Sequence, residues 1–270
     1  MSLLALGKFG LARQQQETAL AIAEKSRSVM TRITALGNLA ESVDRFGHAR
    51  DAIVMVDQTL ELMAEVQNPV MIYEGRVVVS EAKVTFGDYC GAREILGKLS
   101  ADDCTDLPVH SRGQAAYLNA WLDYCLGDTE SSLAHLNALQ RLHRQMGPVL
   151  EYELGEAIRA AILHSRGYKS EARELLLGLD STLRRRGWSY HTCVVNLRLG
   201  EILLEDGDLQ RASRSIDCAL KLSRAMPSRH LNTHAHILRA RYHRLTSERA
   251  TAEGDDWHGT CPGLSQGKGH

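Results

Sequence analysis

Apolar residues recur along this chain at the three- and four-residue spacing of amphipathic helices. The clearest stretch is Leu197 to Leu222, LRLGEILLEDGDLQRASRSIDCALKL, where the spacing holds before Gly207 and resumes after it. A glycine at a helix end permits a positive φ, and the aspartate that follows it, Asp208, is a favourable N-cap for a second helix. The pattern therefore predicts a helix, a tight turn at Gly207 and a second helix.

The same unit recurs every 40 residues. The turn glycines are Gly7, Gly47, Gly87, Gly127, Gly167 and Gly207. A small residue follows each glycine by five positions, at Ala12, Ala52, Ala92, Ser132, Ala172 and Ala212. Another precedes each glycine from the second onward by seven positions, at Ala40, Ser80, Ala120, Ala160 and Gly200. Antiparallel helices approach closely only where neither carries a bulky side chain, so this register predicts an array of packed helix pairs.

Prolines mark the links between pairs, because a proline inside a helix breaks it. They stand at Pro69, Pro108, Pro148 and Pro227. Glycines and prolines together predict helix pairs at 29–46 with 49–66, 70–86 with 89–99, 109–126 with 129–146, 149–166 with 169–186, and 189–206 with 209–225. We expect residues 100–107, SADDCTDL, to form a loop.

The spacing of Gly200, Gly207, Ala212, Ile216 and Ala219 resembles that of the tetratricopeptide repeat (TPR), and the resemblance extends from about residue 7 to residue 242. The 40-residue period is longer than the usual ~34 residues. It is similar to the helical solenoids of MalT-like, LuxR-type bacterial regulators. The resemblance implies an all-α, right-handed superhelix of antiparallel helix pairs. Its concave groove would hold a peptide, a partner domain or a small inducer.

We expect the solenoid to span residues 1–246, with about six repeats, the first of them truncated. Too few residues precede Gly7 for a helix, so the first helix begins near Lys8 without a partner from its own unit. Residues 247–270 lack periodicity and are expected to form a disordered tail. An array that starts in mid-repeat and lacks polar caps looks like a piece of a longer protein or a shortened gene. Its exposed apolar ends favour self-association.

The resemblance implies that residues of each pair's first helix line the groove, Glu201 among them. The equivalent positions of the other repeats hold Glu41, Glu81, Trp121, Ala161 and Arg241. Tyr117 and Tyr124 neighbour Trp121 on the same predicted helix. Acidic and aromatic side chains together would suit a basic or apolar peptide. Alternatively, the aromatic residues pack between repeats and the glutamates are merely solvated.

The charge balance excludes some classes of partner. The chain has 32 basic and 33 acidic side chains, and its basic residues are not gathered into a patch, so we expect no direct contact with nucleic acid. No stretch approaches the ~20 apolar residues of a membrane span. The six cysteines form no CxxC motif and follow no signal peptide, which indicates reduced thiols and a cytoplasmic protein.

Signature motifs of catalysis are missing from the sequence, which contains no GxxxxGK, GxSxG or HExxH. We therefore expect no catalytic residues and no cofactor. His230 and His234 share a helix face with the spacing of a two-histidine metal pair, and His236 lies beside them. No further ligand is fixed nearby, so we expect exposed histidines and no metal.

Two functions fit this pattern. The first is a non-catalytic protein–protein interaction scaffold that forms the sensor or interaction segment of a bacterial signalling or transcriptional regulator. The alternative is a self-contained TPR adaptor that binds a peptide or partner protein in its concave groove. The Tyr117–Trp121–Tyr124 cluster motivates the adaptor, and the 40-residue period motivates the regulator.

Overall fold

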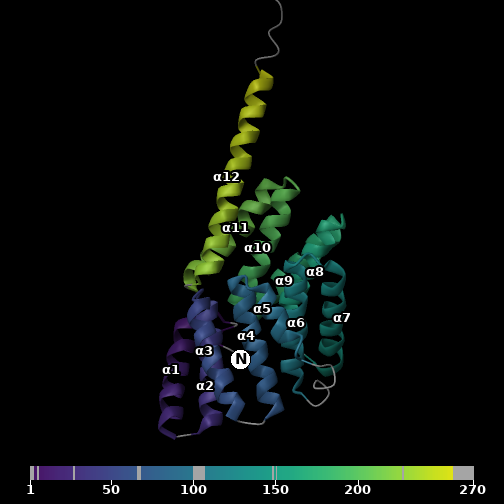
Figure 1. The fold of residues 1–270 in the computed structure, drawn as a ribbon. Coiled ribbons are helices and arrows are strands. Elements are labelled where there is room, and N and C mark those ends of the chain that lie inside the picture. The colour runs from purple at the N-terminus through teal and green to yellow at the C-terminus, as the bar shows by residue number, and fades with distance from the viewer. Residues whose placement is uncertain are drawn as a thin grey trace, which may run out of the picture.

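The computed structural model describes residues 3–4, 6–26, 28–65, 68–99, 107–147, 149, 151–226 and 228–257. The regular elements in these ranges are all helices, as predicted (Figure 1). They are α1 (Phe9–Ser26), α2 (Val29–Arg45), α3 (Ala49–Glu65), α4 (Pro69–Phe86), α5 (Tyr89–Leu96), α6 (Val109–Cys125), α7 (Thr129–Met146), α8 (Tyr152–Ser165), α9 (Lys169–Arg186), α10 (Ser189–Glu205), α11 (Leu209–Ala225) and α12 (Arg229–Trp257).

The five predicted helix pairs are α2 with α3, α4 with α5, α6 with α7, α8 with α9, and α10 with α11. All six recurring glycines have left-handed φ angles, from +71° to +90°. The side chains of Asp88, Asp128 and Asp208 each accept a backbone N–H bond at the start of the second helix. Turn and cap chemistry therefore set the helix ends. The loop expected at 100–107 lies outside the described residues except for Leu107.

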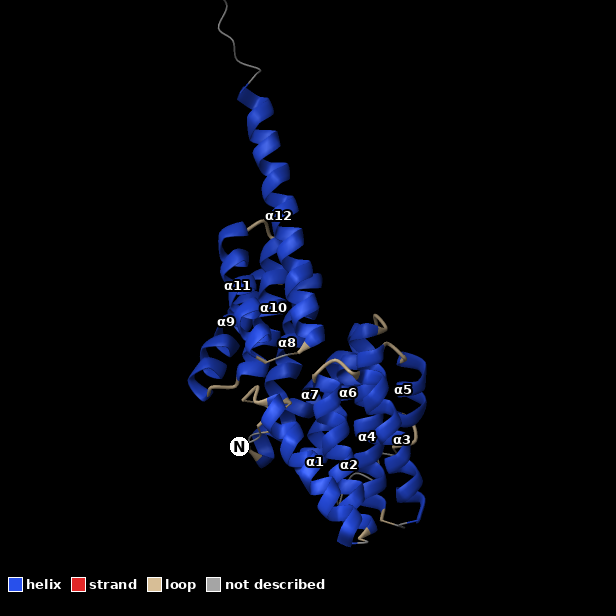
Figure 2. Cartoon of the chain, turned by 90° about the vertical axis from the view of Figure 1, so that its left-hand side faces the viewer, coloured by secondary structure: helices blue, strands red, loops and turns tan. Residues whose placement is uncertain are grey.

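The helices form two layers of a solenoid. The even-numbered helices from α2 to α12 pack side by side in sequence, and each odd-numbered helix packs outside them against its neighbours in the chain (Figure 2). Small residues allow this close approach. Ala52, Ala92, Ala172 and Ala212 are completely buried, and Ser132 is buried with its hydroxyl donating to the carbonyl oxygen of Ala120 at 2.8 Å.

The superhelix turns far enough for its two ends to meet. The hydroxyl of Ser228 donates to the backbone oxygen of Arg45 at 2.9 Å, and the N–H of Arg229 donates to that of Phe46 at 3.2 Å. Phe9 packs edge-on against the rings of Phe46 and Tyr190, with centroids 5.8 Å apart in both pairs. We call this junction between α2 and α12, with Phe9 beside it, the closure contact.

The closure contact changes the expectation for the N-terminal end of the array. Leu4 and Phe9 are buried in the same apolar cluster as residues of α10 and α11, so this part of the end is covered by the chain itself. Ile22 of α1 and Ile237 of α12 are exposed. Self-association through the ends stays a prediction.

The last helix is longer than the repeat pattern indicates. α12 continues past residue 246 to Trp257 and projects away from the rest of the molecule (Figures 1 and 2). The remainder of the expected tail, 258–270, lies outside the described residues, so the proposed division at 246 stays a prediction. Among the described helices, none combines the length and the apolar character that crossing a membrane requires.

Candidate functional site

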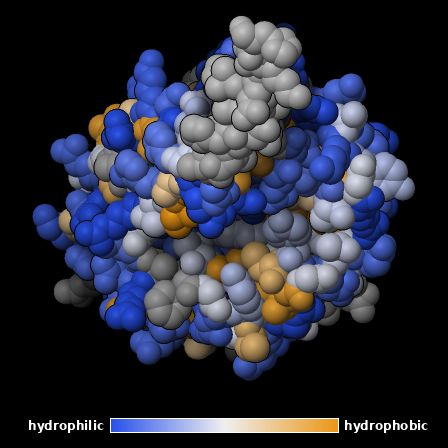
Figure 3. Space-filling view, turned by 90° about the horizontal axis from the view of Figure 1, so that it is seen from above, coloured by the Kyte–Doolittle hydropathy of each residue, from blue (hydrophilic) through white to orange (hydrophobic). Residues whose placement is uncertain are grey.

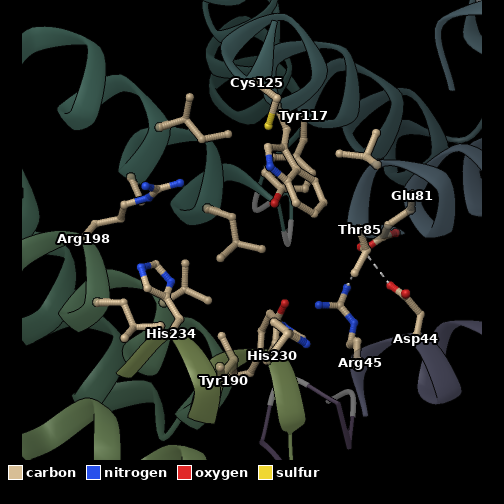
Figure 4. Close-up of a pocket in the computed structure, with 18 of the residues that line it drawn as sticks. Asp44, Arg45, Glu81, Thr85, Tyr117, Cys125, Tyr190, Arg198, His230 and His234 are labelled. Carbon is tan, nitrogen blue, oxygen red and sulfur yellow. Dashed lines mark hydrogen bonds and ion pairs between the residues drawn. The ribbon is translucent and has the colours of Figure 1, made fainter. Parts of the chain in front are cut away.

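The even-numbered helices from α2 to α12, which we call the inner helices, surround a cavity of about 270 Å³. Each of α2, α4, α6, α8, α10 and α12 contributes side chains to its wall, and Tyr89 of α5 adds one more. Figure 4 shows charged and aromatic side chains converging on this space from several helices. Viewed from above, the molecule has a hollow near the middle of a mostly hydrophilic face, with apolar side chains beside it (Figure 3).

The part of each inner helix that lines the cavity shifts from one helix to the next. On α2 it includes Arg45, five residues after the small residue Ala40, whereas on α12 it includes His230, ten residues before Ala240. A shift of 15 residues in register corresponds to roughly 22 Å along a helix. The cavity axis is therefore tilted relative to the inner helices. For the same reason the C-terminal end of α2 contacts the N-terminal end of α12.

Three of the predicted groove residues line this cavity. Glu81 reaches it from α4, and Tyr117 and Trp121 reach it from α6. The rings of Tyr117 and Trp121 stack with their centroids 6.0 Å apart. Both also pack against the apolar cluster around Ile158. The two interpretations of these aromatic residues are thus compatible, since they pack between repeats and still face the cavity.

The other predicted groove residues do not line the cavity. Glu41, Tyr124 and Glu201 each lie against an arginine at its edge, and Arg241 instead lies 3.6 Å from Glu205. Residues at one repeat position lie at the same level on every inner helix, whereas the cavity crosses the helices at an angle. The tilt therefore explains why one register position gives correct cavity residues only on α4 and α6.

Two arginines are held at the cavity wall by carboxylates and rings. Arg45 contacts Glu41 at 3.2 Å and Glu81 at 3.3 Å, and its guanidinium lies 4.6 Å from the ring centroid of Tyr190. The second arginine is Arg198, which contacts Glu201 at 2.9 Å. Its guanidinium lies over the ring of Tyr124. Both guanidiniums therefore have their charge balanced within the protein.

Asp44 is the least compensated charged group in the wall. Its side chain is buried, and its Oδ2 accepts a hydrogen bond from the hydroxyl of Thr85 at 3.2 Å. Its Oδ1 has no hydrogen-bond partner among the described residues. Burial and the nearby Glu81 raise the pKa of Asp44 to about 7, although Arg45 acts in the opposite direction. Burial also raises the pKa of Glu81, against the effect of Arg45.

His230 and His234 were expected to be exposed, and the structure corrects this. Both line the cavity, since the first turns of α12 form part of its wall, and only His236 is exposed. Nε2 of His234 lies 2.7 Å from Oε1 of Glu201. Burial and Arg45 lower the pKa of His230 to about 4. The described residues contain no cluster of three or more side chains suited to hold a metal ion.

Several wall residues were not predicted from the sequence, namely Asp44, Arg45, Tyr190 and Arg198. Arg45 stands in the last turn of a helix, where a basic residue has an ordinary role beside the helix dipole. Tyr190 stands in the first turn of α10. Neither position carries a signal in the local sequence, because both reach the cavity only through the tilt and closure of the superhelix.

No protein family model matches the sequence, and no curated protein matches it. Solved structures do share its fold. A Podosopora anserina kinesin light chain candidate with nearly identical TPR-like repeats superposes with a TM-score of 0.51 at 16% identity, over 71% of this chain and 94% of its own. BtubC (BKLC) from P. vanneervenii gives the same score and identity over 82% of this chain and 90% of its own. The fold is a TPR-like helical repeat. At such low identity the likeness extends to the fold alone.

Proposed function

We propose that this chain is a non-catalytic interaction protein and that the cavity between its inner helices is its binding site. The observation that carries the proposal is the chemistry of the wall. A helical solenoid needs only small and apolar residues to pack, yet this wall holds a buried aspartate, two paired arginines and the rings of three tyrosines and a tryptophan. Burying charges costs several kcal/mol unless they are well compensated, so such groups favour a binding role.

The proposal of a non-catalytic role draws on the same wall. Cys125 is the one cysteine that lines the cavity in the described part of the chain. Burial raises its pKa, so it is a thiol rather than the thiolate that nucleophilic catalysis needs. The sequence also lacks the motifs that would pair a nucleophile with a base.

Within this function we favour the sensor or interaction segment of a bacterial signalling or transcriptional regulator, acting in the cytoplasm. The 40-residue period supports this proposal, and so does the closure contact, which would tighten if a ligand joined opposite walls of the cavity. A cavity of about 150 Å³ accepts benzene, so one of about 270 Å³ has room for roughly ten non-hydrogen atoms. That size suits a small inducer.

The alternative is a self-contained adaptor that binds a peptide or partner protein. The stacked Tyr117 and Trp121 support it, because such rings anchor peptides well. A peptide longer than one or two residues would exceed the volume of about 270 Å³, and we expect it to open the closure contact between Ser228 and Arg45. The adaptor therefore predicts that binding loosens the contact, whereas the sensor predicts that binding tightens it.

The experiment is a screen of small metabolites by thermal shift, with pull-downs for peptide partners. Ligands of the cavity should raise the melting temperature of the wild type and of Tyr168→Ala, which alters an exposed tyrosine in a turn away from the cavity. They should fail to do so with Trp121→Ala. If Trp121→Ala leaves all small-molecule and partner binding intact, the site is wrong. A nucleotide-binding or helix-turn-helix motif encoded in continuity with this reading frame would favour the regulator over the adaptor.

A further inference from the structure

We infer that the cavity binds a small organic cation, an ammonium group carried on an apolar or aromatic body, with Asp44 as its counter-ion. The inference rests on the proposed function of the cavity and adds the charge and size of its ligand. It is drawn from the balance of charges, a buried carboxyl group without an ion pair among the described residues, and the rings that line the same space.

The wall formed by α2 and α4 has more negative than positive groups. Glu41 and Glu81 share the single guanidinium of Arg45, at 3.2 and 3.3 Å. Asp44 lies beside them and forms no ion pair among the described residues, and its side chain accepts one hydrogen bond there, from Thr85. Three carboxyl groups thus face one cation, and Figure 4 shows Asp44, Glu81, Arg45 and Thr85 together on one side of the cavity. A second positive charge would complete this group.

Asp44 supplies a buried carboxyl group beside the place for that charge. Asp44 is only 5% exposed, and its Oδ1 is buried without a hydrogen-bond partner among the described residues. A buried carboxyl group without a full set of hydrogen bonds is costly, and because Oδ1 itself is covered, a cation in the cavity would relieve that cost through its charge. The pKa of about 7 agrees with this, because burial and Glu81 raise it by more than Arg45 and Thr85 lower it.

The rings supply a surface for the body of the ligand. Tyr117 and Trp121 stack and line the cavity. Aromatic faces attract cations, most strongly where water is excluded. The face of Tyr190 is already covered by Arg45, so the pair Tyr117 and Trp121 remains for the ligand.

An anionic ligand fits this wall less well. Its natural partners would be Arg45 and Arg198, but each already contacts carboxylates, Glu41 and Glu81 for the first and Glu201 for the second. An anion at Arg45 would compete with Glu41 and Glu81 for the guanidinium, and leaving the buried Glu81 without its cation is strongly unfavourable. The charge that lacks a partner in the cavity is negative, so the ligand is expected to be positive.

The test is isothermal titration calorimetry at pH 8 with probes of matched shape and different charge. The aromatic set is phenethylamine, 2-phenylethanol and phenylacetate, and the aliphatic pair is hexylamine and hexanol. We expect at least one amine to bind roughly tenfold more tightly than its alcohol, and phenylacetate to bind most weakly of its set. Asp44→Asn should remove the preference for the amine and leave alcohol binding unchanged. Asp57→Asn, an exposed aspartate of α3, should keep the preference.

Equal affinity for amine and alcohol in both sets, tighter binding of phenylacetate, or no binding of any amine would each overturn the inference. The cavity itself would still stand as the site if other ligands bind the wild type and lose affinity in Trp121→Ala. A lysine-containing pentapeptide that binds more tightly than both free amines would overturn the assignment of a small ligand and favour the adaptor.

Discussion

The buried carboxyl group of Asp44 should make the free energy of unfolding depend on pH. Its pKa is raised from the ordinary 3.8 to about 7 by burial and by Glu81. The folded protein therefore keeps a proton on Asp44 in a range of pH where the unfolded chain has lost it. By linkage, this group lowers the free energy of unfolding as the pH rises from about 4 to about 7. The full pKa difference corresponds to a loss of about 4 kcal/mol above that window.

Asp44→Asn removes this cost, because the amide stays neutral at every pH and its oxygen can still accept from the Thr85 hydroxyl. We expect the variant to match the wild type near pH 4 and to be more stable by up to about 4 kcal/mol at pH 8. Urea denaturation followed by circular dichroism at the two pH values measures the difference. The variant must be compared with the wild type at each pH. Burial also raises the pKa of Glu151 to about 7, so this group makes the free energy of unfolding fall with rising pH in both proteins.

Asp57→Asn is the matched control, because it makes the same chemical change at an exposed position. Its stability relative to the wild type should not depend on pH in this range by more than about 0.5 kcal/mol. If Asp44→Asn behaves like this control, the charge of Asp44 is fully compensated in the folded protein. The account of Asp44 as an unmatched buried carboxyl group would then be refuted.

Two further predictions use matched pairs of substitutions. Ala172→Glu places a charge in a completely buried helix crossing and should cost about 3 kcal/mol or more in urea denaturation, whereas Ser170→Glu on the exposed face of the same helix should cost less than about 0.5 kcal/mol; equal costs would invert our assignment of inside and outside. Gly47→Ala and Gly127→Ala replace glycines with φ of 84° and 82° and should each lose about 1 kcal/mol. Only at Gly47 would the new Cβ lie 2.8 Å from Cβ of Arg229. Only Gly47→Ala should therefore speed amide hydrogen exchange at Arg229. Equal exchange in both variants would argue against the closure contact.

Local signals predicted the helices well. A left-handed glycine and an N-cap aspartate act within a few residues of themselves, so Gly207 and Asp208 identify a turn without knowledge of anything distant. The buried alanines at the crossings are equally local, because each pair of helices repeats the same contact. For these reasons the repeat pattern predicted both the fold class and the bounds of the five helix pairs to within a few residues, whereas α12 runs further than it indicates.

The cavity could be predicted only in part. Glu81 and Trp121 were identified because the register position chosen on α4 and α6 happens to coincide with the cavity axis. At Glu201 and Arg241 the same position has moved away from that axis. The direction of the axis depends on small rotations between successive repeats, which add up over the array and leave no mark in any single repeat. The roles of Tyr190 and His230 follow from that sum.

The closure contact also has a consequence for the number of repeats. In an open solenoid a unit can be added or lost with little effect on the others, because each repeat contacts only its neighbours. Here Ser228 contacts Arg45 across 183 residues of sequence, and Met226 lies where a side chain at Gly7 would be. Deleting or duplicating one 40-residue unit would bring the wrong turn to that junction and leave Phe9 without its partners. The number of units between α2 and α12 is therefore fixed by this contact, and the two helices should unfold together instead of fraying independently.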